Sequence, residues 1–194
     1  MIDYKNGAVH ISAEPGAGKT TLCLGIASEA IKGGGRVVWV CRKMPNQERA
    51  TEILWDISNK GYERLSILHL SGSLSSELDL ILSSTVDFGE GDVIIIDDWC
   101  ENHGRAKKGD IHAVNTLSES CEGTNLVITS SAYEDASNAS DGGWVSRGGK
   151  SIRNSLRTVF LLNHPVKDGV KIVSSNNSER YLKMTSKGLK ELIS

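Results

Sequence analysis

Apolar runs alternate with amphipathic stretches along most of this chain, and the alternation predicts a regular succession of strands and helices. Short, mainly apolar runs bounded by glycine or polar residues favour buried strands. Apolar residues at three- and four-residue spacing favour helices that bury one face. The expected strands are 8–12, 36–40, 65–70, 92–97, 125–129 and 156–162. The expected helices run from 21 to the glycines at 33–35, from 47 to 60, from 75 to 84, and from Asp110, as its cap, to about Cys121.

This order of elements predicts an α/β fold with a mostly parallel, twisted sheet that helices cover on both faces. Segments 170–173 and 181–184 follow the sixth strand without a helix between them, so we expect an antiparallel pair at the C-terminal edge. The 194 residues are enough for one full core, and no repeat or low-complexity tail divides them. We therefore expect one domain over residues 1–194.

A glycine-rich loop joins the first expected strand to the first expected helix. Residues 13–21 read A-E-P-G-A-G-K-T-T, which matches the phosphate-binding pattern G-x-x-x-x-G-K-[ST] except that Ala13 replaces the first glycine. Glycines allow the tight turn that points amide N–H groups at phosphate oxygens, the lysine reaches the β- and γ-phosphates, and the following threonine hydroxyl binds Mg²⁺. The pattern predicts binding of ATP with Mg²⁺. The predicted nucleotide-binding residues are Glu14, Pro15, Gly16, Ala17, Gly18, Lys19, Thr20 and Thr21.

Carboxylates end the most apolar expected strand, 92–97. A carboxylate at the end of such a strand, downstream of a phosphate loop, typically holds the Mg²⁺ shell, so Asp97 joins Thr20 as a predicted metal residue. Asp98 has two interpretations: it either activates the attacking water or caps the turn. Thr129 and Ser131, after the fifth strand, either sense the γ-phosphate or are ordinary polar residues at a strand end.

Composition narrows the class of protein further. The hydrophobic content is 39%, the charged content is 24%, and no run of about 18 apolar residues occurs, so we expect a globular cytoplasmic protein without a membrane span. The formal net charge is −2, so any affinity for nucleic acid must come from local patches. The four cysteines lie in or beside apolar segments and form no C-x-x-C pair, which indicates buried free thiols.

The motifs and their order resemble the RecA/RadA recombinase and KaiC superfamily of ATPases, and within it the short archaeal paralogues of the RadB type. The phosphate loop, the strand 36–40 with Glu48-Arg49 after it, and the strand ending in Asp97 are similar to the corresponding family segments. Segment 127–129 resembles the strand that leads into the second DNA loop, and 180–189 resembles the closing hairpin. The resemblance implies a RecA-type ATPase core.

Two departures from the family pattern bear on catalysis. The strand after the first helix usually ends in D-T-E, whose glutamate polarises the attacking water, whereas this chain has Cys41-Arg42-Lys43. A charged lysine cannot act as that base. The family's sensor glutamine corresponds to Ser131. Both departures imply slow hydrolysis with nucleotide binding retained. The chain also begins directly at the first core strand, without the family's N-terminal DNA-binding domain and polymerisation linker, so we expect a monomer or small homo-oligomer rather than long filaments.

Two polar loops, 99–109 and 131–150, correspond to the DNA-facing loops of recombinases. Their cations suit phosphates, and Trp99 or Trp144 would stack a base, although a solvated loop and a flexible lid fit as well. Near the second loop, Lys150 and Arg153 resemble a K-x-R pair that contacts a neighbour's γ-phosphate in hexameric relatives, with one extra residue between them, although an ordinary surface helix turn fits as well. The candidate DNA-binding residues are Arg105, Lys107, Lys108, Trp144 and Arg147.

Two functions follow from the resemblance. The first is an ATP-binding recombinase paralogue with weak or absent ATPase activity, which modulates DNA repair or homologous recombination by binding single-stranded DNA or a full-length recombinase. The second is a DNA-independent signalling ATPase or kinase of the KaiC type. The fold alone does not separate them.

Overall fold

Helices and strands alternate along the chain, as the apolar pattern predicts. The computed structural model describes residues 2–5, 7–121, 123–135, 143–175 and 178–192. The elements are, in order, β1 (Ala8–Ala13), α1 (Lys19–Lys32), β2 (Val37–Cys41), α2 (Gln47–Leu54), α3 (Asn59–Tyr62), β3 (Leu65–His69), α4 (Leu74–Ser84), β4 (Val93–Asp97), α5 (Lys108–Ser120), β5 (Asn125–Ser131), β6 (Tyr133–Glu134), β7 (Trp144–Val145), α6 (Lys150–Arg153), β8 (Arg157–Asn163), β9 (Val170–Ser175), β10 (Ser178–Thr185) and β11 (Gly188–Glu191).

Within the described residues, nine strands form one sheet in the order β11-β10-β9-β8-β1-β5-β4-β2-β3. The pairs from β8 to β3 are all parallel. The strands β9, β10 and β11 extend the sheet by antiparallel pairing. The predicted α/β fold with a mostly parallel sheet and an antiparallel C-terminal edge is therefore confirmed.

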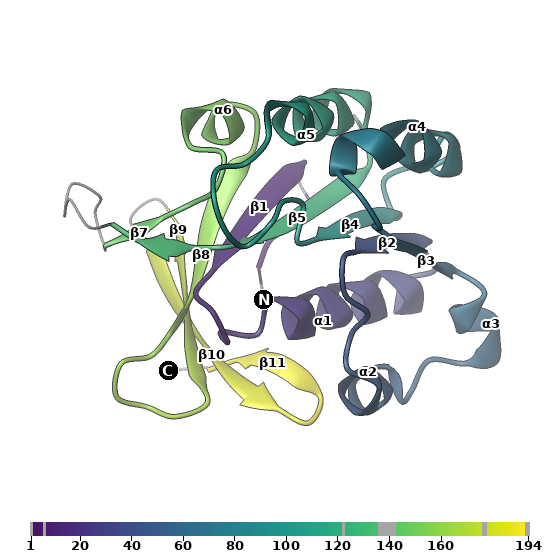
Figure 1. Ribbon diagram of the computed structural model, residues 1–194. Helices are drawn as coiled ribbons and strands as arrows, with labels where there is room; N and C mark the ends of the chain where they lie inside the picture. The colour runs from purple at the N-terminus through teal and green to yellow at the C-terminus, as the bar shows by residue number, and fades with distance from the viewer. Residues whose placement is uncertain (1, 6, 122, 136–142, 176–177, 193–194) are drawn as a thin grey trace.

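Helices cover both faces of the sheet (Figure 1), and alternate residues of each inner strand supply the two cores. In β4, Val93 and Ile95 pack in the core that includes residues of α1, while Ile94 and Ile96 pack in the core that includes residues of α4 and α5. Successive side chains of a strand point to opposite faces, so a strand buried on both faces must be apolar throughout. This explains the continuous apolar runs of the sequence.

Two local predictions about helices are wrong. The expected helix 47–60 ends at Leu54, and a separate helix α3 begins after Ser58, whose side chain accepts a hydrogen bond from the Gly61 amide. The expected cap Asp110 lies inside α5, and its Oδ1 accepts a hydrogen bond from the Ser75 amide, 3.1 Å away in the first turn of α4. The carboxylate satisfies an amide at the start of a neighbouring helix instead of its own.

The topology places the candidate site at one edge of the sheet. Strand β5 lies between β1 and β4, with Ser12 opposite Ser130 and Ile96 opposite Ile128. Because these strands are parallel, the phosphate loop, the segment after Asp97 and the segment after β5 all leave from their carboxyl ends, where α/β folds bind ligands. Within the described residues, no helix is long and apolar enough to cross a membrane.

Candidate functional site

The phosphate loop has the backbone that its glycines permit. Gly16 and Gly18 have φ values of 77° and 97°, in the left-handed region that favours glycine. The Ala17 amide donates to the Glu14 carbonyl at 3.0 Å. The Glu14 side chain accepts a hydrogen bond from the Asn163 amide at 2.7 Å, which ties the loop to the end of β8. The loop is thus held between β1 and β8 and turns directly into α1.

The start of α1 has neither a side-chain cap, since its cap residue is Gly18, nor an acidic residue in its first turn. The N-termini of α2 and α4 are capped by the side chains of Asn46 and Ser73, whereas those of α5 and α6, like that of α1, have no side-chain cap. The first amides of a helix need acceptors and lie at the positive end of its dipole. The first amides of α1 have no side-chain acceptor from the cap residue, an arrangement typical of anion sites at helix N-termini, and phosphate binding there stays a prediction.

Asp97 lies at the centre of a hydrogen-bonded group behind the phosphate loop. Thr20 Oγ1 donates to Asp97 Oδ2 at 2.9 Å, and Thr129 Oγ1 donates to Asp97 Oδ1 at 2.7 Å. The structure thus brings both predicted metal residues together, although they are 77 positions apart in sequence. A threonine hydroxyl beside a carboxylate is the hard-oxygen donor set that Mg²⁺ prefers, so the residues present fit this ion.

Asp98 points to the lysine of the phosphate loop. Its Oδ1 lies 3.3 Å from Lys19 Nζ, and each of the two side chains is 20% exposed. Burial raises the pKa of the Asp98 carboxyl above its usual value; Lys19 opposes this rise, and the charge of Asp97 adds to it. Among the described residues, Asp98 is the one non-glycine residue with a positive φ, at 63°.

The two predicted sensor residues have different partners. Thr129 holds Asp97, and its hydroxyl also accepts a hydrogen bond from the Asp98 amide at 2.9 Å. Ser131 contacts the loop 99–109 instead, through a 2.8 Å hydrogen bond to Asn102 Oδ1. Thr129 therefore contacts the candidate metal residue Asp97, whereas Ser131 contacts the neighbouring loop. Their roles as sensors stay a prediction.

The segment after β2 contains the position expected for the catalytic glutamate. Lys43 is exposed, two residues beyond the end of β2. Arg42 points inward, and its Nε donates to the Asp98 carbonyl at 2.9 Å. β2 lies next to β4, with Cys41 opposite Asp97, so this segment borders the carboxylate pair. The segment therefore carries two cations next to the carboxylate pair, and the correspondence of Lys43 to the family's glutamate stays a prediction.

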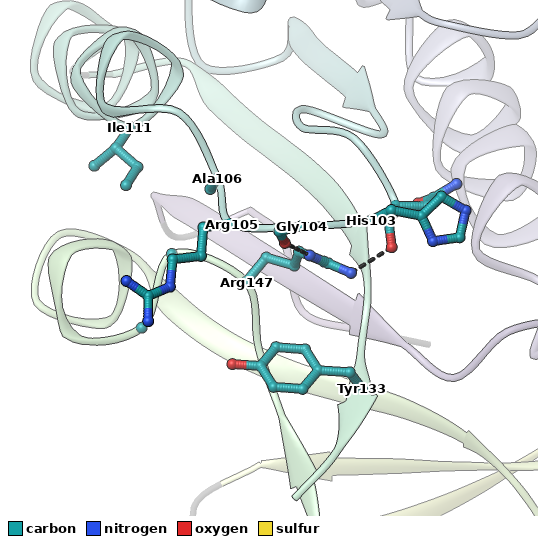
Figure 2. A pocket seen from close by; sticks show the side chains of 10 residues that line it. His103, Gly104, Arg105, Ala106, Ile111, Tyr133 and Arg147 are labelled. Atoms are coloured by element: carbon teal, nitrogen blue, oxygen red, sulfur yellow. Dashed lines mark hydrogen bonds between the residues drawn. The ribbon is translucent and has the colours of Figure 1, made fainter.

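A cavity of about 690 Å³ lies between the two polar loops. Figure 2 shows the Arg147 side chain between the backbone of 102–104 and the Tyr133 ring. Its guanidinium donates to the carbonyls of Asn102 and Gly104, and its central carbon lies 5.4 Å from the ring centroid of Tyr133. Arg147 therefore ties the end of the second loop to the first. Arg105 lines the same cavity and is exposed.

The other candidate DNA-binding residues of the two loops differ in their exposure and in their partners. Lys108 is exposed at the start of α5, whereas Lys107 forms an ion pair with Glu101, at 2.9 Å. Trp144 is half-buried in β7. Trp99 is 0% exposed, so the prediction that it stacks a base is wrong. Residues 136–142 of the second loop lie outside the described residues.

The candidate trans-acting pair lies on α6. Lys150 and Arg153 are exposed, and Arg153 Nε donates to Ser146 Oγ at 3.3 Å. This helix lies on the face of the sheet opposite α1 (Figure 1). The pair therefore stays a prediction about contact with another subunit.

Comparisons with known proteins agree with this geometry. The solved structure of the RadB recombinase matches with a TM-score of 0.73 and 14% identity, over 96% of this chain and 91% of that chain. A DnaB-like replicative helicase, solved in a study of its interactions with primase, matches with a TM-score of 0.68 and 12% identity; it covers 98% of this chain, which spans 58% of the helicase chain. The chain has a RecA-type P-loop fold.

At such low identity the likeness shows the RecA-type fold alone. No model of a known protein family matches this sequence. No curated protein matches it either. Function must therefore be argued from the site that the RecA-type fold carries.

Sequence reasoning missed several residues at the site. Met184 lies over the phosphate loop, because a Cβ on Gly18 would stand 2.6 Å from its terminal methyl group. Arg49 Nη2 donates to the Thr185 carbonyl at 2.7 Å and so joins α2 to the hairpin above the loop. The resemblance drew attention to Arg49 and to the hairpin, but the contact between them depends on tertiary packing.

His10 is a buried polar residue next to Trp99. Its Nε2 lies 2.8 Å from Ser130 Oγ and 3.4 Å from Trp99 Nε1. The indole N–H can only donate, so Nε2 must be an acceptor and the ring must be neutral. Burial, with a smaller contribution from Arg153, lowers the pKa of His10 to about 3.

This low pKa predicts acid sensitivity. The unfolded chain protonates His10 near its ordinary pKa of 6.5, whereas the folded protein does so only near 3, so stability is lost as the pH falls through this window. In His10→Gln we expect the pH dependence of the unfolding free energy between pH 4 and 6 to fall by up to about 1.4 kcal/mol per pH unit. Urea unfolding at a series of pH values measures it. The exposed His112→Gln is the control, and an unchanged slope in His10→Gln would contradict the assignment.

Proposed function

We propose that this chain binds ATP with Mg²⁺ at the phosphate loop and is a RecA-type recombinase paralogue with weak or absent ATP hydrolysis. The observation that carries the nucleotide part is the start of α1, which lacks a side-chain cap and presents Thr20 beside Asp97 and Lys19 beside Asp98. Thr20 and Asp97 would hold Mg²⁺, which neutralises phosphate charge when bound. Calorimetric titration with ATP tests this assignment directly.

Slow hydrolysis is supported by the segment after β2. The residue at the position of the family's catalytic glutamate is the exposed Lys43, and its neighbour Arg42 is bound to the Asp98 backbone. Neither side chain accepts a proton while charged. We therefore expect the chain to bind ATP but to hydrolyse it slowly.

A role in DNA repair or homologous recombination is supported by the cavity between the two loops. Arg105 and Tyr133 line it, and they are exposed, so they offer a phosphate-seeking cation and a ring for stacking. Contacts also lead from the nucleotide site to this cavity: Thr129 holds Asp97, and two residues later Ser131 bonds to Asn102. We infer that ATP strengthens binding of single-stranded DNA through β5, and that a full-length recombinase is a further partner.

The DNA assignment predicts weak, sequence-tolerant and salt-sensitive binding. Replacing Arg105 and Lys108 by glutamate should weaken binding equally for all sequences, and the slope of log K against log salt concentration should fall in magnitude by at least about 1.4, since two phosphate contacts are lost. Fluorescence anisotropy with labelled oligonucleotides at several salt concentrations measures both. Lys60→Glu with Lys183→Glu is the control, because both are exposed on α3 and β10 and change the charge equally.

The alternative is a DNA-independent signalling ATPase or kinase of the same fold. It is supported by the net charge of −2 and by Lys107 and Arg147, which already have partners in the protein. Absence of ATP-sensitive binding to single- or double-stranded DNA at low salt would favour this alternative. In either case Lys150 and Arg153 would reach a neighbouring subunit's nucleotide only in a small homo-oligomer, which light scattering with and without ATP would detect.

A further inference from the structure

The lysine of the phosphate loop already has an anionic partner within the protein. Lys19 Nζ lies 3.3 Å from Asp98 Oδ1, and both side chains are largely shielded from solvent. In a phosphate loop this ammonium group binds the β- and γ-phosphates of the nucleotide. The Asp98 carboxylate therefore lies beside the place that the γ-phosphate must enter, and the two anions compete for one cation.

The backbone holds Asp98 in this place. Its φ of 63° is unfavourable for a residue with a Cβ, so surrounding bonds must maintain it. The Asp98 amide donates to Thr129 Oγ1 on β5 at 2.9 Å, and its carbonyl accepts from Arg42 Nε at 2.9 Å. Because neighbours on both sides fix the peptide, the carboxylate can retreat from a ligand only by rotation of its own short side chain.

Charge repulsion then falls mainly on the γ-phosphate. Two like charges interact more strongly in a partly buried site than in water, and salt screens them less. In a bound nucleotide, the amides at the start of α1 would hold the β-phosphate together with Lys19, whereas the γ-phosphate would depend mainly on the Lys19 ammonium group that Asp98 contacts. A diphosphate avoids most of this repulsion, whereas a triphosphate does not.

We propose that Asp98 is a specificity-determining residue that weakens binding of the γ-phosphate, so that this chain binds ATP no more tightly than ADP. The inference rests on the proposed nucleotide site, and it adds a selectivity that the phosphate-loop motif does not contain. It does not depend on whether Asp98 also orients the attacking water. The fraction of the chain bound to each nucleotide would then follow the ratio of ATP to ADP in solution.

Calorimetry with ADP and with the non-hydrolysable imido analogue of ATP, both with Mg²⁺, tests the proposal. The wild type should bind the two with similar affinity. Asp98→Asn should bind the triphosphate analogue about tenfold more tightly or better, and ADP less than about threefold more tightly, because it removes the repelling charge and frees Lys19. Asparagine keeps the size of the side chain and is among the residues that tolerate positive φ.

Glu101→Gln is the matched control. It removes the same charge three residues along the chain, from an exposed ion pair with Lys107, and should leave both affinities unchanged. If Asp98→Asn does not fold, Asp98→Gly removes the carboxylate at a φ that glycine adopts readily. A wild type that prefers the triphosphate more than tenfold, or an unchanged ratio in the Asp98 variants, would overturn the proposal and leave the nucleotide site intact. A wild type that binds neither nucleotide would overturn both.

Discussion

Replacing Lys19 by alanine should weaken ATP binding on the order of 100-fold, because it removes the side-chain cation of the phosphate loop. Hydrogen bonds to charged groups contribute about 1.5–3 kcal/mol each, and the lysine contacts two phosphates. Titration calorimetry or a fluorescent ATP analogue measures the affinity. Thermal unfolding must show that the variant is folded, since the change leaves the partly buried Asp98 without its ion-pair partner.

Lys32→Ala is the matched control for this experiment. Lys32 lies in the last turn of the same helix α1, is exposed, and pairs with Asp56, at 2.7 Å. Its loss should leave the affinity for ATP unchanged. Combining Lys19→Ala with Asp98→Asn separates two causes of the expected loss of affinity. If the unpaired Asp98 carboxylate repels the phosphates, the double variant binds ATP more tightly than Lys19→Ala. If the loss comes from the missing ammonium group alone, the two variants bind ATP equally. A folded Lys19→Ala protein that binds ATP as well as the wild type would contradict the proposed nucleotide site.

The parts of the site that follow from local sequence could be predicted. The phosphate loop depends on Gly16 and Gly18, whose positive φ is a property of the residue type. The contact between Thr20 and Asp97 follows from topology, because β1 and β4 are parallel and the loops after them share one edge of the sheet. These strands could be predicted from their continuous apolar runs, because a strand that is buried on both faces does not alternate apolar and polar residues.

The parts that depend on distant partners could not be predicted. Trp99 follows two aspartates at the start of a polar loop, a setting typical of an exposed ring, yet it is fully buried beside His10. Arg147 has the charge of a phosphate-binding residue, but carbonyls some 45 positions earlier bind its guanidinium. The sequence shows which chemical groups these side chains carry, but only tertiary packing decides which neighbours they contact.

If Lys43 occupies the position of a catalytic glutamate, as we propose, changing it to glutamate should raise the rate of ATP hydrolysis. Proton transfer by a positioned side chain is typically worth about 10²–10⁴-fold in rate, so a correctly placed carboxylate should raise ATP turnover by about 10²-fold over a slow wild type. Lys43 lies two residues beyond β2, whose last residue, Cys41, is opposite Asp97, so the proposed site is within a short distance along the chain. Release of phosphate at saturating ATP measures the rate.

Two control variants separate base catalysis from simple changes of charge. Lys43→Gln removes the cation without supplying a base and should turn over as slowly as the wild type. Met44→Glu supplies a carboxylate one residue further along, on a side chain that is 53% exposed, and should also have no effect. If the wild type turns over rapidly and Asp98→Asn abolishes this activity, Asp98 is the water-activating residue and Lys43 is not a disabling change. Because Asp98→Asn is also expected to tighten triphosphate binding, its rate must be compared at saturation, where affinity no longer affects turnover.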